Sequence, residues 1–280
     1  MKDFVGLNIA RYRKEQDLTQ NELAKQLSIS YQAVSKWENG VTKPDISLLP
    51  VLASILNVSI DSLMGYSHNF DPRSYYEEVY NNDEYFWGVE PSAMCLKVLE
   101  LLPPTKPLSL LDIGCGEGKD AVFFARCGYK VSAFDISDAG IQKTKRLAEK
   151  ANVYVDVFKA NILDFRLERK YDILFSNGVL HHVKPELRNE IFANYKEFTE
   201  DGGINVLQCL IEKPFITDVP GKYNHSEHWK SGQLFTLYHD WYLEECSEYV
   251  FDCNSSGVPH KHAANRMYAR KIIQSAGSIK

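Results

Sequence analysis

The sequence lacks any apolar stretch that approaches the ~20 residues of a membrane-spanning helix, so no such helix is expected in its 280 residues. Its opening residues, MKDFVGLNIARYRK, lack the basic segment, apolar core and small-residue cleavage site of a signal peptide. A cytoplasmic location is therefore the default expectation.

The chain also has no large excess of charge of one sign. Its net charge of −5 argues against binding a polyanion over the whole surface, although it allows a local basic face.

Cysteine pairs with metal-binding or redox spacing are absent. None of the six cysteines forms a C-x-x-C pair, and a chain of this length can bury its own core without covalent links. We therefore expect free, mostly buried thiols rather than disulfides.

Two histidine pairs, His225-x-x-His228 and His260-x-His262, have spacings that could suit a metal. A zinc site needs three or four convergent ligands, and an H-E-x-x-H helix is missing, so no metal site is expected.

Two different hydrophobic periodicities divide the chain. Residues 4–64 show the pattern of short helices, whereas apolar runs rich in Val, Ile and Phe alternate with helical patterns from about residue 108 onward. The second pattern is typical of β-α units around a parallel sheet. A polar stretch with Gly, Pro, Asn and Asp separates the two. We expect an N-terminal all-α domain at 1–66, a linker at 67–74 and an α/β domain at 75–280.

The N-terminal helices have recognisable boundaries. Thr19 stands three residues before Glu22, as a capping box requires, and Ser30 and Gly40 are placed to start and stop the next helix. Two short helices joined by a tight turn predict a helix-turn-helix unit.

The order of these features, TQ-ELA, LSIS, VSKWENG and KPD, resembles the lambda-repressor-like (Xre-type) helix-turn-helix family over about residues 4–64. The resemblance implies binding to double-stranded DNA as a dimer on a two-fold site, with the second helix of the motif in the major groove. Gln32 is the best candidate for reading sequence, because its amide can pair with adenine through two hydrogen bonds. The residues implied at base edges are Tyr31, Gln32, Ser35 and Lys36, and those implied at phosphates are Gln20 and Asn39.

The charge of this region leaves a second interpretation open. Residues 1–66 carry seven basic and seven acidic side chains, so a monomer gains little from attraction to phosphates. A helical bundle used only for dimerisation would show a similar pattern.

A glycine-rich turn follows the first apolar run of the α/β region. The run LSLLDI is continuous, as in a strand buried on both faces, and GCGEG must then turn tightly into the helix KDAVFFARCG. Glycine lets the main chain take positive φ and lets a ligand approach it, and the helix N-terminus adds N–H donors. The spacing is neither the G-x-G-x-x-G of dinucleotide sites nor the G-x-x-x-x-G-K-[ST] of P-loops.

With an acidic residue two positions before its first glycine, DIGCGEG resembles the first motif of the class I S-adenosylmethionine-dependent methyltransferases. Later segments agree in order: GYKVSAFDIS as a second strand, YDILFSNGVLHHV as a fourth and DGGINVLQCLI as a fifth. The resemblance implies a Rossmann-like seven-stranded domain and S-adenosyl-L-methionine as cofactor. In this family pattern Asp135 accepts hydrogen bonds from the ribose hydroxyls. Asn161 stands where the family commonly has an aspartate near the adenine. The cofactor residues implied are Asp112, Gly114, Cys115, Gly116, Asp135, Ile136, Asn161, Ile162, Asn177 and Gly178.

The segment Tyr75 to Met94 is unusually aromatic. It suits a helix packed on the sheet as well as it suits a lid over the methionine end of the cofactor. In the second interpretation an aromatic ring faces the sulfonium by cation–π attraction, with Tyr80 and Trp87 among the candidates.

Motifs that would make nucleic acid the methyl acceptor are missing. The fourth-strand loop contains SNGV where DNA amino-group methylases carry [DNS]-P-P-[YFW], and the chain has no Pro-Cys pair of the kind used on cytosine carbon. A small acceptor is therefore expected, and only an acceptor that must lose a proton needs a base.

His182 and His260 are the candidates for catalysis, as acceptor contact or general base, because imidazole titrates near neutral pH. Each could equally be a hydrogen-bonded structural residue.

The stretches WKSGQL and GVPHKHAANRMYARK resemble the tellurite-resistance methyltransferase family over about residues 90–272. The resemblance implies methylation of a soft oxyanion such as tellurite or selenite, or of a thiol-like acceptor. Lys261 replaces the arginine that follows the family's histidine, which weakens the oxyanion interpretation because a bidentate guanidinium is lost, and Arg266 could compensate. Two further arginines of the family are Phe235 and Thr236 here.

These features predict a small-molecule methyltransferase with an N-terminal DNA-binding regulatory domain. The alternative is a transcriptional regulator that uses its methyltransferase fold to sense the cofactor or another ligand. Asn161 and the missing arginines favour this alternative.

Overall fold

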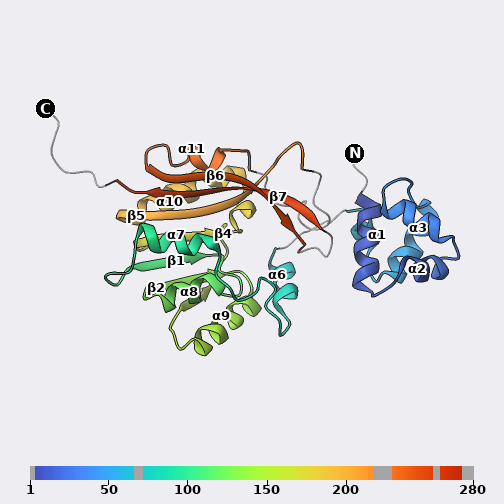
Figure 1. Cartoon of the computed structure of the whole chain (residues 1–280), viewed down its shortest axis with the longest axis horizontal. Coiled ribbons are helices and arrows are strands. Elements are labelled where there is room, and N and C mark those ends of the chain that lie inside the picture. The colour runs from blue at the N-terminus through green and yellow to red at the C-terminus, as the bar shows by residue number, and fades with distance from the viewer. Residues whose placement is uncertain (1–3, 66–71, 217–228, 255–258, 273–280) are drawn as a thin grey trace. The chain divides into compact units, whose positions relative to one another are not determined.

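The computed structural model describes residues 4–65, 72–216, 229–254 and 259–272 (Figure 1). The chain divides into two compact units. One contains the described parts of residues 1–70, 214–226 and 250–262, and the other contains those of 71–213, 227–249 and 263–280. Among the described residues, no helix has both the length and the apolar character that crossing a bilayer requires.

Short helices form the N-terminal region, as the sequence predicts. Thr19 Oγ1 accepts from the N–H of Glu22 at 3.2 Å, and the Glu22 carboxylate accepts from the N–H of Thr19 at 2.7 Å, which confirms the capping box. Ser30 caps the following helix as predicted. The bounds are α1 Phe4–Glu15, α2 Gln20–Gln26, α3 Tyr31–Glu38, the 3₁₀ turn η1 Ile46–Leu48, α4 Leu49–Ile55 and α5 Ile60–Leu63.

These five α-helices enclose one apolar core. Val34 of α3 is fully buried and Trp37 nearly so, whereas Gln32 and Lys36 are exposed. Helix α3 therefore packs by one face and leaves the other free for a partner. The core side chains with no exposed surface are Ile9, Leu23, Val34, Leu52, Leu56 and Leu63.

A seven-stranded sheet confirms the predicted Rossmann-like architecture, with the strand order β3-β2-β1-β4-β5-β7-β6 (Figure 1). Strands β1 to β5 pair in parallel, and β7 runs antiparallel to β5 between it and β6. The bounds are β1 Ser109–Ile113, β2 Lys130–Asp135, β3 Asp156–Lys159, β4 Tyr171–Asn177, β5 Thr199–Ile211, β6 Tyr242–Cys253 and β7 His260–Arg270.

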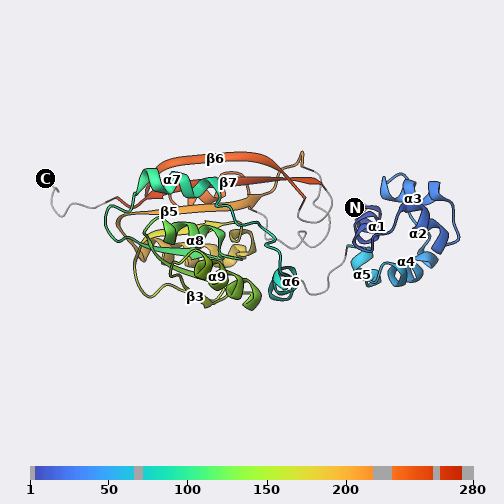
Figure 2. The ribbon, with the colours of Figure 1, turned by 60° about the horizontal axis from the view of Figure 1, so that its bottom comes forward.

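Helices pack against this sheet (Figure 2). Helices α7, α8 and α9 share one core with β1, β2 and β4, to which β4 contributes Ile173 and Phe175. Leu174 lies between them on the opposite face and is also fully buried, so both faces of the sheet are covered. The bounds are α6 Pro72–Tyr80, α7 Ala93–Leu101, α8 Lys119–Arg126, α9 Asp138–Lys150, the 3₁₀ turn η2 Leu180–His182, α10 Pro185–Glu197 and α11 Gln233–Thr236.

Only the last residues of the predicted linker, 67–74, lie within the described part of the chain. Residues 72–74 form the first turn of α6, and residues 67–71 lie outside the described part of the chain. Proline is tolerated in the first turn because its missing N–H would have no helical partner there.

The strand order reverses between β1 and β4, where β2 continues the sheet on one side and β5 on the other. In open α/β sheets, ligands bind in the crevice at the carboxyl ends of the strands at such a reversal. The predicted cofactor residues 112–116, 135–136, 161–162 and 177–178 lie in or just after β1, β2, β3 and β4. The fold therefore collects them at one edge of the sheet.

Candidate functional site

The glycine turn follows β1 at this carboxyl edge. Gly114 and Gly118 have φ values of 71° and 86°, which L side chains rarely adopt. A Cβ on Gly114 would lie 2.7 Å from the side chain of Val179, and a Cβ on Gly118 would lie 2.5 Å from that of Thr144. The turn therefore requires glycine at both positions, for conformation and for space.

Asp135 ends β2 beside the turn. One carboxylate oxygen accepts from the N–H of Gly116 at 2.8 Å, and the other accepts from that of Ser137 at 3.0 Å. Burial raises the pKa of Asp135, while these backbone N–H groups oppose the shift. The N–H of Ile136 opposes the shift as well, and a carboxylate offers about four lone-pair sites, so about one or two remain for the hydroxyl groups of a sugar.

Asp112 lies in β1 with its side chain buried. Its Oδ2 atom has no hydrogen-bond partner among the described residues. Burial, followed by the nearby carboxylate of Asp120, raises the pKa of Asp112 well above its usual range. Buried polar atoms normally have a partner, so a donor group of a ligand would satisfy this oxygen.

The end of α6 and the segment that follows it lie against the same turn. Tyr80 is buried, and its hydroxyl would lie 3.1 Å from a Cβ placed on Gly116. The same hydroxyl accepts from Trp87 Nε1 at 2.9 Å. The structure thus contains features of both interpretations of the aromatic segment: residues up to Tyr80 form a helix, and those after it approach the turn.

A buried ion pair anchors this segment. Lys143 Nζ lies 2.8 Å from Glu117 Oε1, and both side chains are 1% exposed. The Glu117 carboxylate also accepts from the N–H groups of Phe86 and Trp87 at 3.1 and 3.0 Å, and Lys143 donates to the carbonyl oxygen of Glu84. Neither charged residue is among those that the sequence predicts. Glu117 stands inside the glycine turn, but its pairing with Lys143 of α9 depends on tertiary packing.

Asn161 follows β3 and uses its amide within its own loop. Its Oδ1 accepts from the N–H of Leu163 at 3.1 Å, and its Nδ2 donates to Asp164 at 3.2 Å. An Asx-type turn of this kind positions the loop without any ligand. The contact between Asn161 and an adenine therefore stays a prediction.

The other predicted cofactor residues lie around the turn and the strand ends. Burial raises the pKa of the Cys115 thiol well above its ordinary value, which disfavours the nucleophilic thiolate. Ile162 is buried, Ile136 is half-buried, and Gly178 has a φ of 84° with open space where a Cβ would stand. Their positions are compatible with a bound nucleoside, whose contacts stay predictions.

Asn177, at the end of β4, belongs to a chain of polar side chains along the sheet edge. It donates to Asp120 Oδ2 at 3.1 Å and accepts from Gln208 Nε2 at 3.1 Å. Arg266 donates to Gln208 Oε1 at 3.2 Å and to the Tyr249 hydroxyl at 2.6 Å. The sequence singles out Asn177 and Arg266, but it does not reveal Gln208, which links them.

His182 lies in η2, after β4. Its Nε2 atom is 3.2 Å from the hydroxyl of Tyr76. Burial lowers the pKa of His182 to about 4, so the imidazole is neutral at pH 7 and a weak proton acceptor. General bases work best with a pKa near the working pH, so these features favour a hydrogen-bonding role for His182. His260, the second catalytic candidate, belongs to the other compact unit.

Replacing His182 with glutamine should change the pH dependence of stability. Because the pKa of His182 is lower in the folded than in the unfolded chain, its stabilising contribution is complete above about pH 6.5 and is lost as the pH falls toward 4. Between these values we expect the wild type to lose at most about 3 kcal/mol of unfolding free energy relative to the variant. Chemical denaturation at several pH values measures this difference.

The control for this experiment is His239→Gln, because His239 is exposed. That variant should follow the wild type at every pH. If the wild-type and His182→Gln curves stay parallel from pH 6.5 to pH 4, the pKa of His182 is not lowered.

The predicted DNA-contacting residues lie on and beside α3. Tyr31, Gln32, Lys36 and Asn39 are exposed, and Ser35 is half-buried. These five residues therefore share one helix and its C-terminal cap, as the prediction requires, although their contacts with DNA stay predictions.

Gln20, the predicted phosphate contact on α2, is held by a buried ion pair. Its amide donates to Glu38 Oε2 at 2.7 Å, while Arg13 donates to both oxygens of the same carboxylate at 2.6 and 2.9 Å. This arrangement ties α1, α2 and α3 together. Arg13 and Glu38 are absent from the sequence prediction because they lie 25 residues apart.

Comparison with known proteins identifies two family regions. Residues 72–266 match the model of the family described as tellurite resistance protein TehB, and residues 9–63 match a helix-turn-helix model. The first region takes up more than two thirds of the 280 residues.

Similar curated proteins share only part of their length with this chain. A probable S-adenosyl-L-methionine-dependent methyltransferase TehB of Haemophilus influenzae is 28% identical over 170 residues, which cover 59% of this chain and 58% of that protein. Hemagglutinin 1 of Eikenella corrodens is 28% identical over 177 residues, which cover 62% and 58%. The chain thus matches less than two thirds of the length of either relative.

A solved structure shows the same fold. The crystal structure of TehB from Haemophilus influenzae has a TM-score of 0.57 and 22% identity, over 71% of this chain and 66% of that chain. From the extent of the matched region, the chain belongs to the tellurite resistance protein TehB family, and a helix-turn-helix domain precedes the family region.

Proposed function

We propose that this protein is an S-adenosyl-L-methionine-dependent methyltransferase for a small acceptor, with a DNA-binding domain at 1–66 and the methyltransferase domain at 75–280. The observation that carries the proposal is the glycine turn beside Asp135. It places a turn that needs glycine at residues 114 and 118, with Val179 and Thr144 packed close to it, next to a buried carboxylate with acceptor sites to spare. The cofactor named for the relative from Haemophilus influenzae supports the same reading.

The residues at the sheet edge fit this cofactor. The remaining acceptor sites of Asp135 suit ribose hydroxyls, and the buried Oδ2 of Asp112 suits the ammonium group of the methionine part. Tyr80 and Trp87 place aromatic rings close to Gly116, and we propose that one of them contacts the sulfonium. When bound, S-adenosyl-L-methionine supplies an electrophilic methyl group, and these side chains hold it, align the acceptor and keep water away.

A soft oxyanion or a thiol is the acceptor class that we propose. Arg266 supplies the positive charge for an oxyanion, because it is linked through Gln208 to Asn177 at the end of β4. Lys261 is a weaker candidate, since its ammonium lies 2.6 Å from the Asp252 carboxylate. His182, neutral at pH 7, is placed to accept a hydrogen bond.

Two measurements test the enzymatic proposal. Calorimetry of the full chain with S-adenosyl-L-methionine and with its demethylated product should show binding of both. Labelled cofactor incubated with tellurite, selenite, arsenite and simple thiols should then yield labelled product. Tight binding without turnover over the whole panel would favour the alternative of a ligand-sensing regulator. Absence of binding would contradict the enzymatic proposal and leave only a regulator that senses another ligand.

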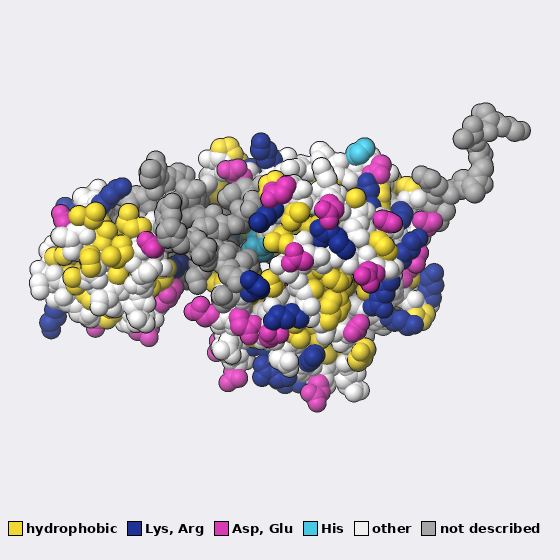
Figure 3. All heavy atoms as spheres, turned by 180° about the vertical axis from the view of Figure 1, so that it is seen from behind, with side chains coloured by type: hydrophobic (Ala, Val, Ile, Leu, Met, Phe, Trp, Pro, Cys, Tyr) yellow, Lys and Arg dark blue, Asp and Glu magenta, His cyan; other side chains and the backbone are white. Residues whose placement is uncertain are grey.

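We also propose that the helical domain binds DNA as a dimer. Hydrophobic side chains gather on one face of this domain (Figure 3), and its exposed large apolar residues include Val41, Ile46 and Met64. An apolar patch of this kind is typical of an interaction surface. Light scattering of the full chain should give twice the mass of one chain, and a monomer at working concentration would contradict dimerisation.

Replacing Gln32 with alanine should relax DNA sequence preference. A bidentate amide–adenine pair contributes about 1–3 kcal/mol of discrimination, so the preference at one base pair should fall about 5- to 150-fold. Replacing Asn39, a predicted phosphate contact, should instead weaken binding evenly across sequences, because phosphate contacts carry no sequence information. Fluorescence anisotropy on a selected operator and its single-base variants measures both effects.

The matched control is Gln16→Ala, an exposed glutamine after α1. Its affinity and base preference should equal those of the wild type. Unchanged base preference in the Gln32 variant would mean that α3 does not read the site through this residue.

A further inference from the structure

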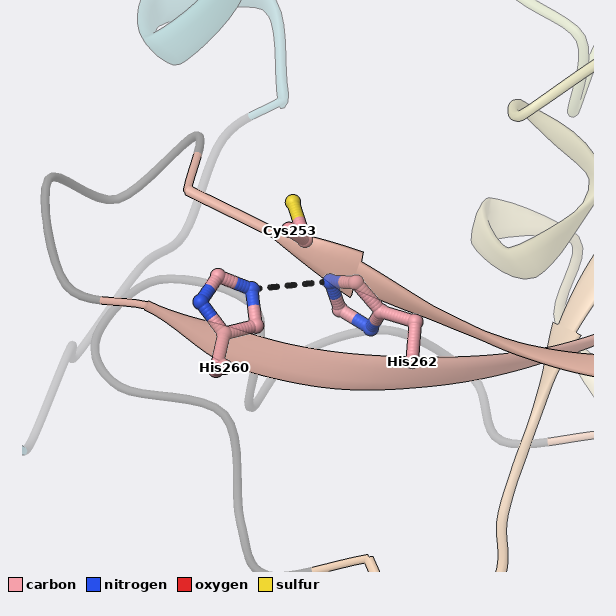
Figure 4. A group of neighbouring side chains, drawn as sticks. All are labelled: Cys253, His260 and His262. Carbon is pink, nitrogen blue, oxygen red and sulfur yellow. Dashed lines mark hydrogen bonds between the residues drawn. The ribbon is translucent and has the colours of Figure 1, made fainter.

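Cys253, His260 and His262 converge where β6 ends and β7 begins (Figure 4). Their thiol and ring-nitrogen atoms lie within 4.8 Å of one another. The two histidines are the His260-x-His262 pair from which the sequence alone predicts no metal site. Pairing of β6 with β7 supplies the third group, because the end of one strand faces the start of the next. The other predicted pair, His225 and His228, lies outside the described residues.

Strand geometry places the two imidazoles together. Residues two apart on a strand share a face, so His260 and His262 point to the same side while Lys261 points away and pairs with Asp252. The Nε2 atoms of the two rings are 3.0 Å apart. The ring of Phe251 packs against His262 with centroids 5.6 Å apart, which restrains that ligand.

The separations are close to those of a tetrahedral metal site. Zinc–nitrogen bonds of about 2.0–2.1 Å and a zinc–sulfur bond of about 2.3 Å place ligand atoms about 3.3–3.6 Å apart. The observed atoms, 3.0 Å apart for the nitrogens and at most 4.8 Å for any pair, reach that geometry with side-chain shifts of about 1 Å. One thiolate and two imidazoles suit Zn²⁺ or Cu⁺ and do not suit Mg²⁺ or Ca²⁺, which take oxygen ligands.

We propose that Cys253, His260 and His262 bind a Zn²⁺ ion, with a fourth coordination position open to water or another ligand. Three protein ligands and one open position are the arrangement of zinc sites that exchange ligands. In this role His260 gives a lone pair to the metal, so it is not a general base for methyl transfer. The competing explanation is a hydrogen-bonded pair of imidazoles beside an ordinary thiol.

The experiment uses the full chain, reduced and stripped of metal with a chelator. Titration with Co²⁺, which stands in for Zn²⁺ and absorbs light, should saturate at one ion per chain. It should also give a near-ultraviolet thiolate-to-cobalt band, which Zn²⁺ then displaces. Cys253→Ser should abolish that band and weaken Zn²⁺ binding at least about tenfold, since even outer-shell changes at metal sites cost about 10- to 100-fold. His260→Gln should weaken binding to a similar extent.

Two controls are matched in residue type. Cys246→Ser changes an exposed cysteine of the same strand, and His239→Gln changes an exposed histidine. Both variants should bind Zn²⁺ as the wild type does, and circular dichroism of every variant checks its folding. The proposal is overturned if no ion binds stoichiometrically, if the cobalt band survives Cys253→Ser, or if only Cu⁺ is taken up. None of these readouts depends on methyl transfer.

Discussion

Replacing Asp135 with alanine should weaken the binding of S-adenosyl-L-methionine by at least about 100-fold. In our proposal the carboxylate accepts two sugar hydroxyls, and a hydrogen bond to a charged group contributes about 1.5–3 kcal/mol. Two such bonds exceed the 2.7 kcal/mol that corresponds to about 100-fold in affinity. The variant also frees the N–H groups of Gly116 and Ser137, which adds to the loss because the turn is then less ordered.

Calorimetry with the cofactor and with its demethylated product measures this effect. Asp138→Asn is the control, because Asp138 lies three residues further on in an exposed ion pair with Lys159 at 2.5 Å. Its affinity should change by less than about twofold, as expected for a screened surface pair. Wild-type affinity in the Asp135 variant would show that the cofactor is not held at this edge of the sheet.

Replacing Glu117 with glutamine should lower the free energy of unfolding by about 3–5 kcal/mol, which is the usual cost of removing one partner of a buried ion pair. The change leaves Lys143 charged and almost without access to solvent. It also weakens two of the hydrogen bonds that hold residues 86 and 87 beside the glycine turn. Denaturant unfolding followed by tryptophan fluorescence measures the loss, since Trp87 lies in the segment concerned.

The double variant Glu117→Gln, Lys143→Met makes this test specific. With both charges gone, no unpaired charge is buried, so it should be more stable than either single variant. Glu100→Gln is the surface control, because Glu100 is exposed and pairs with Lys97 at 3.0 Å, so no measurable change is expected. Additive losses in the double variant would mean that the two residues do not act as a pair.

Local features of the sequence predicted the parts of the fold that depend on neighbouring residues. The capping box of Thr19 and Glu22 acts over three residues, and the turn at 114–118 needs positive φ wherever the chain goes next. The alternation of apolar strands and helices likewise fixed the α/β class and placed Asp135 at a strand end. Such features need no knowledge of distant contacts.

Features that join distant residues could not be predicted in this way. Glu117 and Lys143 are 26 residues apart, and Gln208 meets Arg266 across 58 residues of sequence. Cys253 joins the two histidines only because β6 and β7 pair. Charge, amide and thiol groups have no periodicity that marks their partners, so these contacts become visible only once the strands are ordered.

The insertion of β7 between β5 and β6 has a consequence for synthesis of the chain. Residues 263–270 complete the hydrogen bonding of residues 204–211, whose side chains are largely buried. A growing chain whose residues 263–270 have not yet left the ribosome therefore presents an open, apolar edge on β5, the kind of surface that captures foreign strands. Nascent molecules of this protein should depend on chaperone protection until residues 263–270 emerge, and termination before them should yield aggregates rather than a smaller folded product.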